Sequence, residues 1–257
     1  MTLSQAMNQA KKTLAPFDAL LLAEHAFKLD KTALRLQPNL PVNPSHYFGL
    51  VARRAAGEPL QYILGNWEFY GLPFAIGPGV LIPRPETEML VELVLNANGE
   101  NATIIDLCAG SGCVGLSIAH HLPHAQVHLV ELSDAALPYL KQNAASHSNV
   151  TLHHADAFSL NLKANIVVSN PPYIATHELA GLQQEVQHEP AMALDGGADG
   201  LDFYRKLAQH WLPQCDVLAV ECGDGQAEDI VQLFGGGQIL QDFNGIGRVV
   251  LAKGKQV

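Results

Sequence analysis

The sequence predicts an α/β fold in which a small helical bundle precedes a mostly parallel sheet with helices on both faces. From residue 102 onward, short β-branched runs alternate with longer helical stretches, a pattern typical of β-α-β units. The last two predicted strands flank the short turn 244–247, which is rich in glycine, so the final strand should be antiparallel to its neighbour. Residues 1–65 instead carry apolar residues at helical spacing.

Composition limits the classes of function. The chain has 257 residues, of which 48% are hydrophobic and 16% charged, so it can bury a substantial core. Its formal net charge of −10 argues against a broad basic face for duplex nucleic acid, and we expect no stable nucleic-acid binding. No apolar run reaches transmembrane length, so we expect no membrane association and a cytoplasmic protein.

The use of cysteine, histidine and apolar residues adds three expectations. The cysteines show no Cys-x-x-Cys spacing, so we interpret them as reduced and mostly buried thiols: Cys108, Cys113, Cys215 and Cys222. The 12 histidines show no spacing typical of metal ligands, so no metal site is predicted. No exposed apolar stripe is evident, which favours a monomer.

The chain is predicted to have three parts: a helical domain over residues 1–70, a hairpin-like connector over 71–85, and the sheet domain over 86–257. Within the first part, Ser45 can cap a helix that ends at Gly57. The segment around the connector is rich in proline, glycine and aromatic residues, and Trp67–Tyr70 and Phe74–Ile76 are predicted to form its strands. A helix should then open at Glu86 or Thr87.

The sheet domain follows in order. Its predicted strands are 103–107, 127–132, 150–154, 166–169, 217–221, 238–243 and 248–251. Its predicted helices are 112–121, 134–147, 199–212 and 226–234. Pro138 conflicts with this pattern, because it sits too deep for the first turn of a helix that begins after Ser133.

The first candidate site is a strand that ends in Asn-Pro-Pro-Tyr. Ile166–Ser169 is predicted to be buried, and Pro171 and Pro172 stop it because proline lacks the N–H that a sheet ladder needs. Asn170 and Tyr173 are therefore presented at the carboxyl end of a strand, where open α/β sheets bind ligands. An amide and an aromatic ring there suit a planar group that carries an NH₂. Taken alone, asparagine before proline is also common in turns.

A glycine-rich loop after the first strand is the second candidate site. Its glycines allow a tight turn and a close approach of the backbone to a ligand. Roughly 20 residues further on, the second strand ends at Glu131, which can accept both hydroxyls of a ribose. The predicted loop consists of Cys108, Ala109, Gly110, Ser111 and Gly112.

The acidic residues near this loop distinguish between two nucleoside ligands. Asp106 is expected in the loop that cradles the ligand's tail, where it would repel a pyrophosphate and attract a cation. This favours S-adenosylmethionine, with its sulfonium and ammonium groups, over NAD. After the third strand, Asp156 would accept from an adenine amine, and Ala157 and Phe158 would form an apolar wall. Asp156 can equally cap a helix.

Together these residues resemble class I S-adenosylmethionine-dependent methyltransferases. More narrowly, they resemble the family that methylates the glutamine of the Gly-Gly-Gln motif in bacterial peptide chain release factors. The likeness covers nearly the whole chain, and its most specific parts are the connector and the Ile-Pro-Arg-Pro-Glu-Thr-Glu segment. Asn-Pro-Pro-Tyr alone is shared with nucleic-acid N-methyltransferases. The matching segments are 59–65, 67–71, 81–88, 169–174, 193–197 and 200–204.

The resemblance implies a seven-stranded, Rossmann-like class I methyltransferase sheet with an antiparallel last strand. It implies methyl transfer from S-adenosylmethionine to N5 of that glutamine in class I release factors, which tunes translation termination. Residues 1–70 would then dock the protein substrate. The loop Cys108–Gly112, Glu131, Ala157 and Asn170 would contact the cofactor, and Asn170–Tyr173 would hold the substrate glutamine, with Asn170 as the catalytic residue.

The chain departs from the family pattern at three places. Cys108-Ala109-Gly110 stands where Gly-Thr-Gly is usual, Glu131 replaces the commoner aspartate, and Ala157 stands where an aromatic residue is sometimes found. We expect these changes to shift the cofactor slightly. Arg84 and Glu86 could pair with each other and fix the connector.

Three other functions remain as alternatives. The first is an N-methyltransferase with the same motif that acts on nucleic acid or on another protein, against which the acidic composition weighs. The second is an NAD-dependent oxidoreductase, which needs an acid or base that Asn-Pro-Pro-Tyr does not supply. The third is a non-catalytic interaction module, against which the intact Asp106, Glu131 and Asn170 argue.

Overall fold

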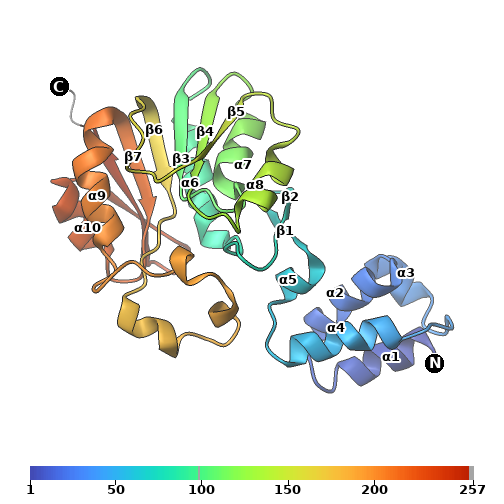
Figure 1. Cartoon of the computed structure of the whole chain (residues 1–257). Helices are drawn as coiled ribbons and strands as arrows, with labels where there is room; N and C mark the ends of the chain where they lie inside the picture. Colours follow the sequence, from blue (N-terminus) through green and yellow to red (C-terminus); the bar gives the residue numbers. More distant parts are fainter. Residues whose placement is uncertain (98, 255–257) are drawn as a thin grey trace. The chain divides into compact units, whose positions relative to one another are not determined.

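The computed structural model describes residues 1–97 and 99–254, which form two compact units (Figure 1). The predicted boundaries at residues 70 and 85 stay predictions, and residues 98 and 255–257 of the predicted 86–257 domain lie outside the described residues. The first unit comprises Met1–Asn66 and Gln183–His188, and the second comprises Trp67–Leu182 and Glu189–Val257.

The first unit is helical, as its apolar spacing predicts. Leu3, Leu22 and Tyr47 are fully buried in its core, and the Tyr47 hydroxyl donates to the Ala19 carbonyl at 2.9 Å. A buried hydroxyl with a partner avoids the desolvation cost of an unpaired polar group. The helices of this unit are α1 (Leu3–Ala10), α2 (Pro16–Phe27), α3 (Lys31–Leu36), α4 (Ser45–Ala55) and α5 (Leu60–Leu64).

Two helix starts in this unit show how local chemistry sets the boundaries. Asp30 caps α3, because its carboxylate accepts from the Ala33 N–H at 2.7 Å. The predicted cap at Ser45 is wrong. Ser45 is the first residue of α4, Pro44 holds the cap position, and the Ser45 N–H donates to the Asn43 side chain at 3.1 Å. The side chain of Asn43, two residues before the helix begins, therefore satisfies the Ser45 N–H.

The predicted hairpin lies where the chain passes from the first unit into the second. Strands β1 (Asn66–Phe69) and β2 (Leu72–Ala75) form a two-stranded sheet. A 3₁₀ turn, η1 (Pro85–Thr87), then precedes helix α6 (Glu88–Asn96), so this helix begins just after the predicted Glu86 or Thr87.

The main sheet of the second unit has seven strands in the order β5-β4-β3-β6-β7-β9-β8. Neighbouring strands are parallel from β5 to β7, whereas β9 is antiparallel to both β7 and β8. The predicted fold class is therefore confirmed. The strands are β3 (Thr103–Leu107), β4 (Gln126–Glu131), β5 (Val150–His154), β6 (Ala164–Ser169), β7 (Cys215–Glu221), β8 (Gln238–Gln241) and β9 (Gly247–Lys253).

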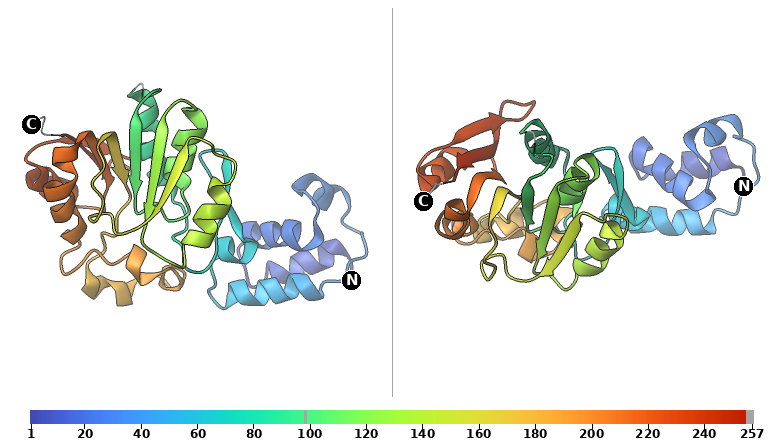
Figure 2. Two further views of the ribbon diagram at one scale, coloured as in Figure 1. Left: turned by 45° about the horizontal axis from the view of Figure 1, so that its top comes forward. Right: turned by 90° about the horizontal axis from the view of Figure 1, so that it is seen from above.

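Helices flank this sheet on both faces (Figure 2). Leu107, Val167 and Leu218 face the side on which α9 and α10 bury Tyr204 and Ile230. Helices α6 and α7 contact each other and pack on the sheet. Among the described residues, no helix combines the length and apolar character that a membrane crossing requires. The helices are α7 (Cys113–His121), α8 (Leu137–Ala144), α9 (Asp202–His210) and α10 (Ala227–Phe234).

The conflict at Pro138 is resolved by the position of α8. This helix begins at Leu137 and not at residue 134, which places Pro138 in its first turn, where no N–H bond is lost. Residues before it form a turn in which the Ala136 N–H donates to the Ser133 carbonyl at 3.2 Å. Proline thus marks the true helix start, which periodicity alone placed too early.

Candidate active site

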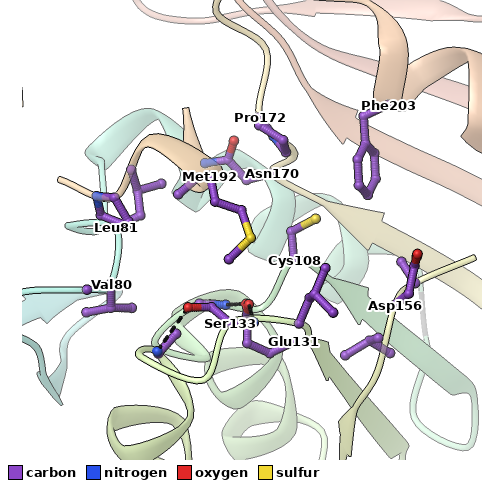
Figure 3. Close-up of a pocket in the computed structure, with 18 of the residues that line it drawn as sticks. Val80, Leu81, Cys108, Glu131, Ser133, Asp156, Asn170, Pro172, Met192 and Phe203 are labelled. Atoms are coloured by element: carbon purple, nitrogen blue, oxygen red, sulfur yellow. Dashed lines mark hydrogen bonds between the residues drawn. The ribbon is translucent and has the colours of Figure 1, made fainter. Parts of the chain in front are cut away.

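One cavity lies at the carboxyl edge of the sheet, where strands β3, β4, β5 and β6 end (Figure 3). Its volume is about 270 Å³. The carboxyl ends of parallel strands meet at one edge, so residues far apart in sequence converge there. The predicted site residues that line it are Cys108, Gly110, Glu131, Asp156, Ala157, Asn170 and Pro172.

The glycine-rich loop turns tightly after β3. Gly110 (φ 56°) and Cys108 (φ 60°) both adopt the left-handed conformation. For cysteine this conformation costs roughly 1–2 kcal/mol, so the surrounding structure must hold it in place. Removal from bulk water, together with the charges of Glu131 and Asp106, raises the pKa of the Cys108 thiol well above its usual value. The backbone of Cys108 therefore shapes the loop, while its thiol stays protonated and unreactive.

Glu131 ties the end of β4 to this loop. Its carboxylate accepts hydrogen bonds from the Gly110 N–H and the Ser133 N–H, each at 2.7 Å (Figure 3). The residue is only 8% exposed. A carboxylate has about four acceptor positions, so two of them remain for hydroxyl groups of a ligand. Glu131 is thus a fixed and buried acceptor, not a surface carboxylate.

Asp106 lies inside β3 and not in the loop where it was expected. It is 2% exposed, and its carboxylate accepts from the Gly115 N–H of α7 at 2.9 Å. Burial raises its pKa to about 7, the Gly115 hydrogen bond opposes that rise, and the nearby Glu131 charge adds to it. Asp106 does not line the cavity, so its part in cofactor binding stays a prediction.

The segment after β5 forms one wall of the cavity. Asp156 accepts from the Phe158 N–H two residues on, at 2.8 Å, which is a local turn rather than a helix cap. Ala157 is held by the Trp211 indole, which donates to its carbonyl at 3.0 Å. Phe158 does not line the cavity, and its ring packs against Phe203 at a centroid distance of 4.9 Å. The aromatic surface of the cavity therefore comes from Phe203.

Asn170 follows β6 directly and lines the cavity. Its side-chain NH₂ donates to the Thr87 hydroxyl at 3.1 Å, which leaves the amide oxygen to accept from another group. Pro172 also lines the cavity, whereas the half-buried Tyr173 packs against the core cluster of the sheet. Burial raises the pKa of Tyr173 to about 12, so its hydroxyl stays protonated.

The turn after Tyr173 is closely packed. The Ile174 N–H donates to the Leu194 carbonyl at 2.9 Å, and the Gly196 N–H donates to the Ile174 carbonyl at 2.8 Å. A Cβ at Gly196 would lie 2.8 Å from the Tyr173 Cα, so only glycine allows this approach. The backbone of the Asn-Pro-Pro-Tyr segment is thereby fixed.

Seven of the predicted site residues do not line the cavity. They support its walls from behind or lie within the loop: Asp106, Ala109, Ser111, Gly112, Phe158, Pro171 and Tyr173. Conversely, the cavity has further lining residues that sequence reasoning did not select as site residues. Some of them lie in the segments 81–88, 193–197 and 200–204, which carry the resemblance to the family and are therefore a usable signal. They are Gly79, Val80, Leu81, Val130, Leu132, Ser133, Ala136, Ala155, Pro190, Met192, Ala193, Asp195 and Phe203.

Two supporting contacts were also missed. Asn143 of α8 donates to the Ser111 carbonyl at 2.8 Å and to the Ala75 carbonyl at 3.0 Å, so it clamps the loop to β2. Arg84 forms an ion pair with Glu189, and the proposed pairing of Arg84 with Glu86 is wrong. Because Glu189 is far from Arg84 in the sequence, the motif alone suggested the neighbouring Glu86 as the partner of Arg84.

The cysteines and histidines in the described part of the chain form neither a disulfide nor a cluster that could hold a metal ion. The cysteines are free thiols, and Cys113, Cys215 and Cys222 are buried. Within residues 1–97 and 99–254, no group of three or more histidine, cysteine, aspartate or glutamate side chains is arranged to hold a metal ion.

Family models match both parts of the chain. Residues 2–65 match the model described as "PrmC N-terminal domain", and residues 85–198 match the model described as "Methyltransferase small domain". Among solved structures, the hMettl16 catalytic domain in complex with MAT2A 3'UTR hairpin 1 superimposes with a TM-score of 0.60. It covers 97% of this chain and 91% of that chain at 13% identity, so this likeness concerns the fold alone.

Curated relatives match over most of their length. The release factor glutamine methyltransferase of Geobacter sulfurreducens is 45% identical over 244 residues, which cover 89% of this chain and 86% of the relative. The protein with the same name from Moorella thermoacetica is 40% identical over 278 residues, covering 98% of each chain. Identity at this level over nearly the whole length shows the family. The chain belongs to the release factor glutamine methyltransferases, as its motifs predict.

Proposed function

We propose that this enzyme transfers a methyl group from S-adenosylmethionine to N5 of the glutamine in the Gly-Gly-Gln motif of class I release factors, and so tunes translation termination. Membership of the family supports the reaction and the methyl donor. One observation carries the assignment of the site. A single cavity brings Asn170, Glu131 and Gly110 together at the edge of the sheet.

The residues of this cavity fit S-adenosylmethionine. Glu131 and Asp156 line it, and Asp106 lies behind it, so the site suits a ligand that carries positive charge. Val130, Ala157 and Phe203 provide apolar and aromatic surface for a purine. When bound, S-adenosylmethionine supplies a methyl group activated by a positively charged sulfur. Ala157 stands where some members of the family have an aromatic residue, and Phe203 provides an aromatic face for the purine in its place.

We assign the cofactor contacts to Cys108, Gly110, Glu131, Ala157 and Asn170. Glu131 accepts from the ribose hydroxyls through its remaining acceptor positions, and the loop backbone approaches the ligand's tail. Asp106 acts through its charge: a cation in the cavity favours its ionised form and lowers a pKa that burial has raised to about 7. Asp156, which also lines the cavity, accepts from the adenine amine, and the other predicted contacts, Ala109, Ser111, Gly112 and Phe158, shape the loop and the wall.

Asn170 orients the substrate amide. An amide nitrogen is a poor nucleophile because its lone pair is delocalised into the carbonyl, so alignment is the main task of the site. The Asn170 side-chain oxygen and the Pro171 carbonyl each accept one N–H of the glutamine. Both acceptors favour the positive charge that develops on the nitrogen during transfer. Pro172 and Tyr173 keep this segment rigid and complete the pocket for the amide.

Four further points belong to the same proposal. The helical unit Met1–Asn66 docks the release factor, because the glutamine that reaches the cavity is part of a large protein. The enzyme acts as a monomer in the cytoplasm. The net charge of −10 supports the absence of stable nucleic-acid binding.

The proposal is tested by incubating the purified enzyme with S-adenosylmethionine and an unmodified class I release factor, followed by peptide mass spectrometry. One added methyl on the Gly-Gly-Gln glutamine is expected. Asn170→Ala should reduce turnover by at least about 100-fold, since it removes an acceptor that acts in the transition state. Asn244→Ala is the matched control, because Asn244 is an exposed residue between β8 and β9 and does not line the cavity.

Two results would contradict this proposal in different ways. Wild-type turnover by Asn170→Ala would remove the assigned role of Asn170. Cofactor binding without methylation of the release factor would leave the fold and the donor intact, and would direct the search to another protein or to nucleic acid.

A further inference from the structure

A second polar residue stands directly behind Asn170. Thr87, the last residue of η1, accepts the hydrogen bond from the Asn170 NH₂ at 3.1 Å. Thr87 is 2% exposed, so water does not compete for its hydroxyl. A threonine hydroxyl carries one hydrogen and two lone pairs. While its oxygen accepts from Asn170, its hydrogen needs an acceptor elsewhere.

Glu221 provides that acceptor. It is the last residue of β7, which is the strand next to the one that Asn170 follows, and it is 2% exposed. Its side chain lies close enough to that of Thr87 for the Thr87 hydroxyl to lower the pKa of its carboxyl, so it can accept the hydrogen of that hydroxyl. Its second oxygen, Oε2, is buried and has no hydrogen-bond partner among the described residues. Burying a carboxylate in this way is costly, and the nearby charges of Arg248 and Arg84 offset only part of that cost, since burial still raises the pKa of Glu221.

We propose that Thr87 and Glu221 are positioning residues that fix which end of the Asn170 amide faces the cavity. In its ionised form, which predominates at pH 8, Glu221 only accepts hydrogen bonds, so it directs the Thr87 hydrogen toward itself. The Thr87 oxygen then only accepts, and it selects the NH₂ end of Asn170. The carbonyl end of Asn170 is left facing the substrate.

This polarity matters because the two ends of an asparagine amide have nearly the same shape. Packing alone does not distinguish them, but hydrogen bonding does. With the amide turned over, the Asn170 NH₂ would meet the N–H groups of the substrate glutamine, and two donors would face each other in a desolvated site. Such a mismatch disfavours the aligned complex strongly. This inference rests on the proposed role of Asn170 as acceptor for the substrate amide.

The first test removes the hydroxyl of Thr87 without changing its shape. Thr87→Val should lower kcat about tenfold or more, because the fraction of correctly oriented Asn170 falls. Thr87→Ser keeps a hydroxyl and should retain near-wild-type kcat. The KM for S-adenosylmethionine should change little in either variant. A merely structural role of Thr87 would not separate kcat from KM, and serine would not rescue it.

The second test removes the carboxylate. Glu221→Met has a similar length and no strong acceptor, so it should lower kcat by a similar factor without loss of thermal stability. If both residues act through one relay, the double variant should lose no more activity than the more impaired single variant. If Thr87→Val does not fold, Glu221→Met and its double variant with Thr87→Ser carry the test.

The outcomes separate this inference from the proposed function. Wild-type kcat in Thr87→Val or in Glu221→Met, measured beside an inactive Asn170→Ala, would overturn the relay alone. Independent and additive losses would also overturn it. An active Asn170→Ala would instead overturn the role of Asn170, on which the relay depends.

Discussion

Asn143 holds the cofactor loop and the hairpin together through a single side chain. Its NH₂ donates to the Ser111 carbonyl at 2.8 Å and to the Ala75 carbonyl at 3.0 Å, while its oxygen accepts from the Ala75 N–H at 2.8 Å. Three backbone groups therefore depend on one half-buried amide. The glycine loop is fixed from outside the cavity, by a residue that does not line it.

Asn143→Ala should consequently weaken both stability and cofactor binding. Leaving these backbone groups without a partner should cost about 1–3 kcal/mol in the free energy of unfolding. A looser loop should raise the Kd for S-adenosylmethionine several-fold. Denaturant unfolding and calorimetric titration measure the two effects, with the exposed Gln142→Ala on the same helix as control. Unchanged affinity together with lowered stability would show that the loop does not need this clamp.

The ion pair between Arg84 and Glu189 supports another wall of the cavity. The Glu189 side chain is 2% exposed and that of Arg84 is 33% exposed. Glu189 also accepts from the Ile82 N–H at 2.9 Å. The pair joins two segments that contribute Leu81 and Pro190 to the cavity lining.

Glu189→Ala should lower the free energy of unfolding by about 2 kcal/mol, because it leaves a buried N–H and a partly buried guanidinium without their partner. It should also raise the KM for S-adenosylmethionine. Glu189→Gln keeps an acceptor for Ile82 and should lose less. The exposed pair of Asp199 and Arg205 supplies the control, since Asp199→Asn should change neither quantity measurably. Equal losses for the alanine and glutamine variants would mean that the charge alone matters.

Stability should fall with rising pH in a way that depends on Glu221. Burial raises the pKa of Glu221 from 4.5 to about 7, the Thr87 hydrogen bond opposes this, and so do the charges of Arg248 and Arg84, while Glu86 adds to it. The folded protein then binds more protons than the unfolded chain between pH 4.5 and 7. The free energy of unfolding therefore decreases as pH rises through this window.

Glu221→Gln should remove this part of the pH dependence. Denaturant unfolding at pH 5 and pH 8 should show a larger loss of stability in the wild type than in the variant. Asp106, whose pKa burial also raises to about 7, contributes in the same direction and should keep some of the slope. The exposed Glu92→Gln serves as control. Identical slopes for the wild type and Glu221→Gln would place the titration of Glu221 outside this pH range.

Most of the fold could be predicted from local signals. β-branched runs bounded by turn residues marked the strands, and the glycine-rich turn before Arg248 marked the antiparallel end. Errors occurred at helix starts, where a single contact decides the boundary. The start of α4 depends on Asn43, which accepts the Ser45 N–H, and α8 begins where Pro138 can enter its first turn. Hydrophobic periodicity contains neither piece of information.

Only some of the residues that form the cavity could be predicted from the sequence. Gly110, Glu131 and Asn170 were found because each lies at or just after the end of a strand at the same edge of a parallel sheet, a place that topology fixes. Thr87 and Asn143 were not predicted as site residues, because their roles arise from contacts with residues 83 and 68 positions away in the sequence. No local motif marks either residue. Residues that hold a site in place are set by tertiary packing, and a single sequence carries little signal for them.

Helix α7 packs closely against the sheet at Gly115. A Cβ there would lie 2.1 Å from the Leu129 side chain and 3.0 Å from the Cβ of Asp106. Leu129 and Asp106 are both buried, so neither can move away freely. Gly110, Gly112 and Gly115 have the spacing Gly-x-Gly-x-x-Gly, and the structure gives the third glycine the role of close helix–strand packing.

Gly115→Ala should therefore lower the free energy of unfolding by about 1–3 kcal/mol, in spite of the better helix propensity of alanine. It should also weaken binding of S-adenosylmethionine, because the displaced α7 no longer holds the Asp106 carboxylate. Gly49→Ala in α4 is the matched control, since nothing lies within 4 Å of the added Cβ. That variant should gain about 0.5–1 kcal/mol. If the free energy of unfolding falls in Gly115→Ala and rises in Gly49→Ala, then packing, and not helix propensity, requires glycine at position 115. A rise in both variants would contradict this explanation.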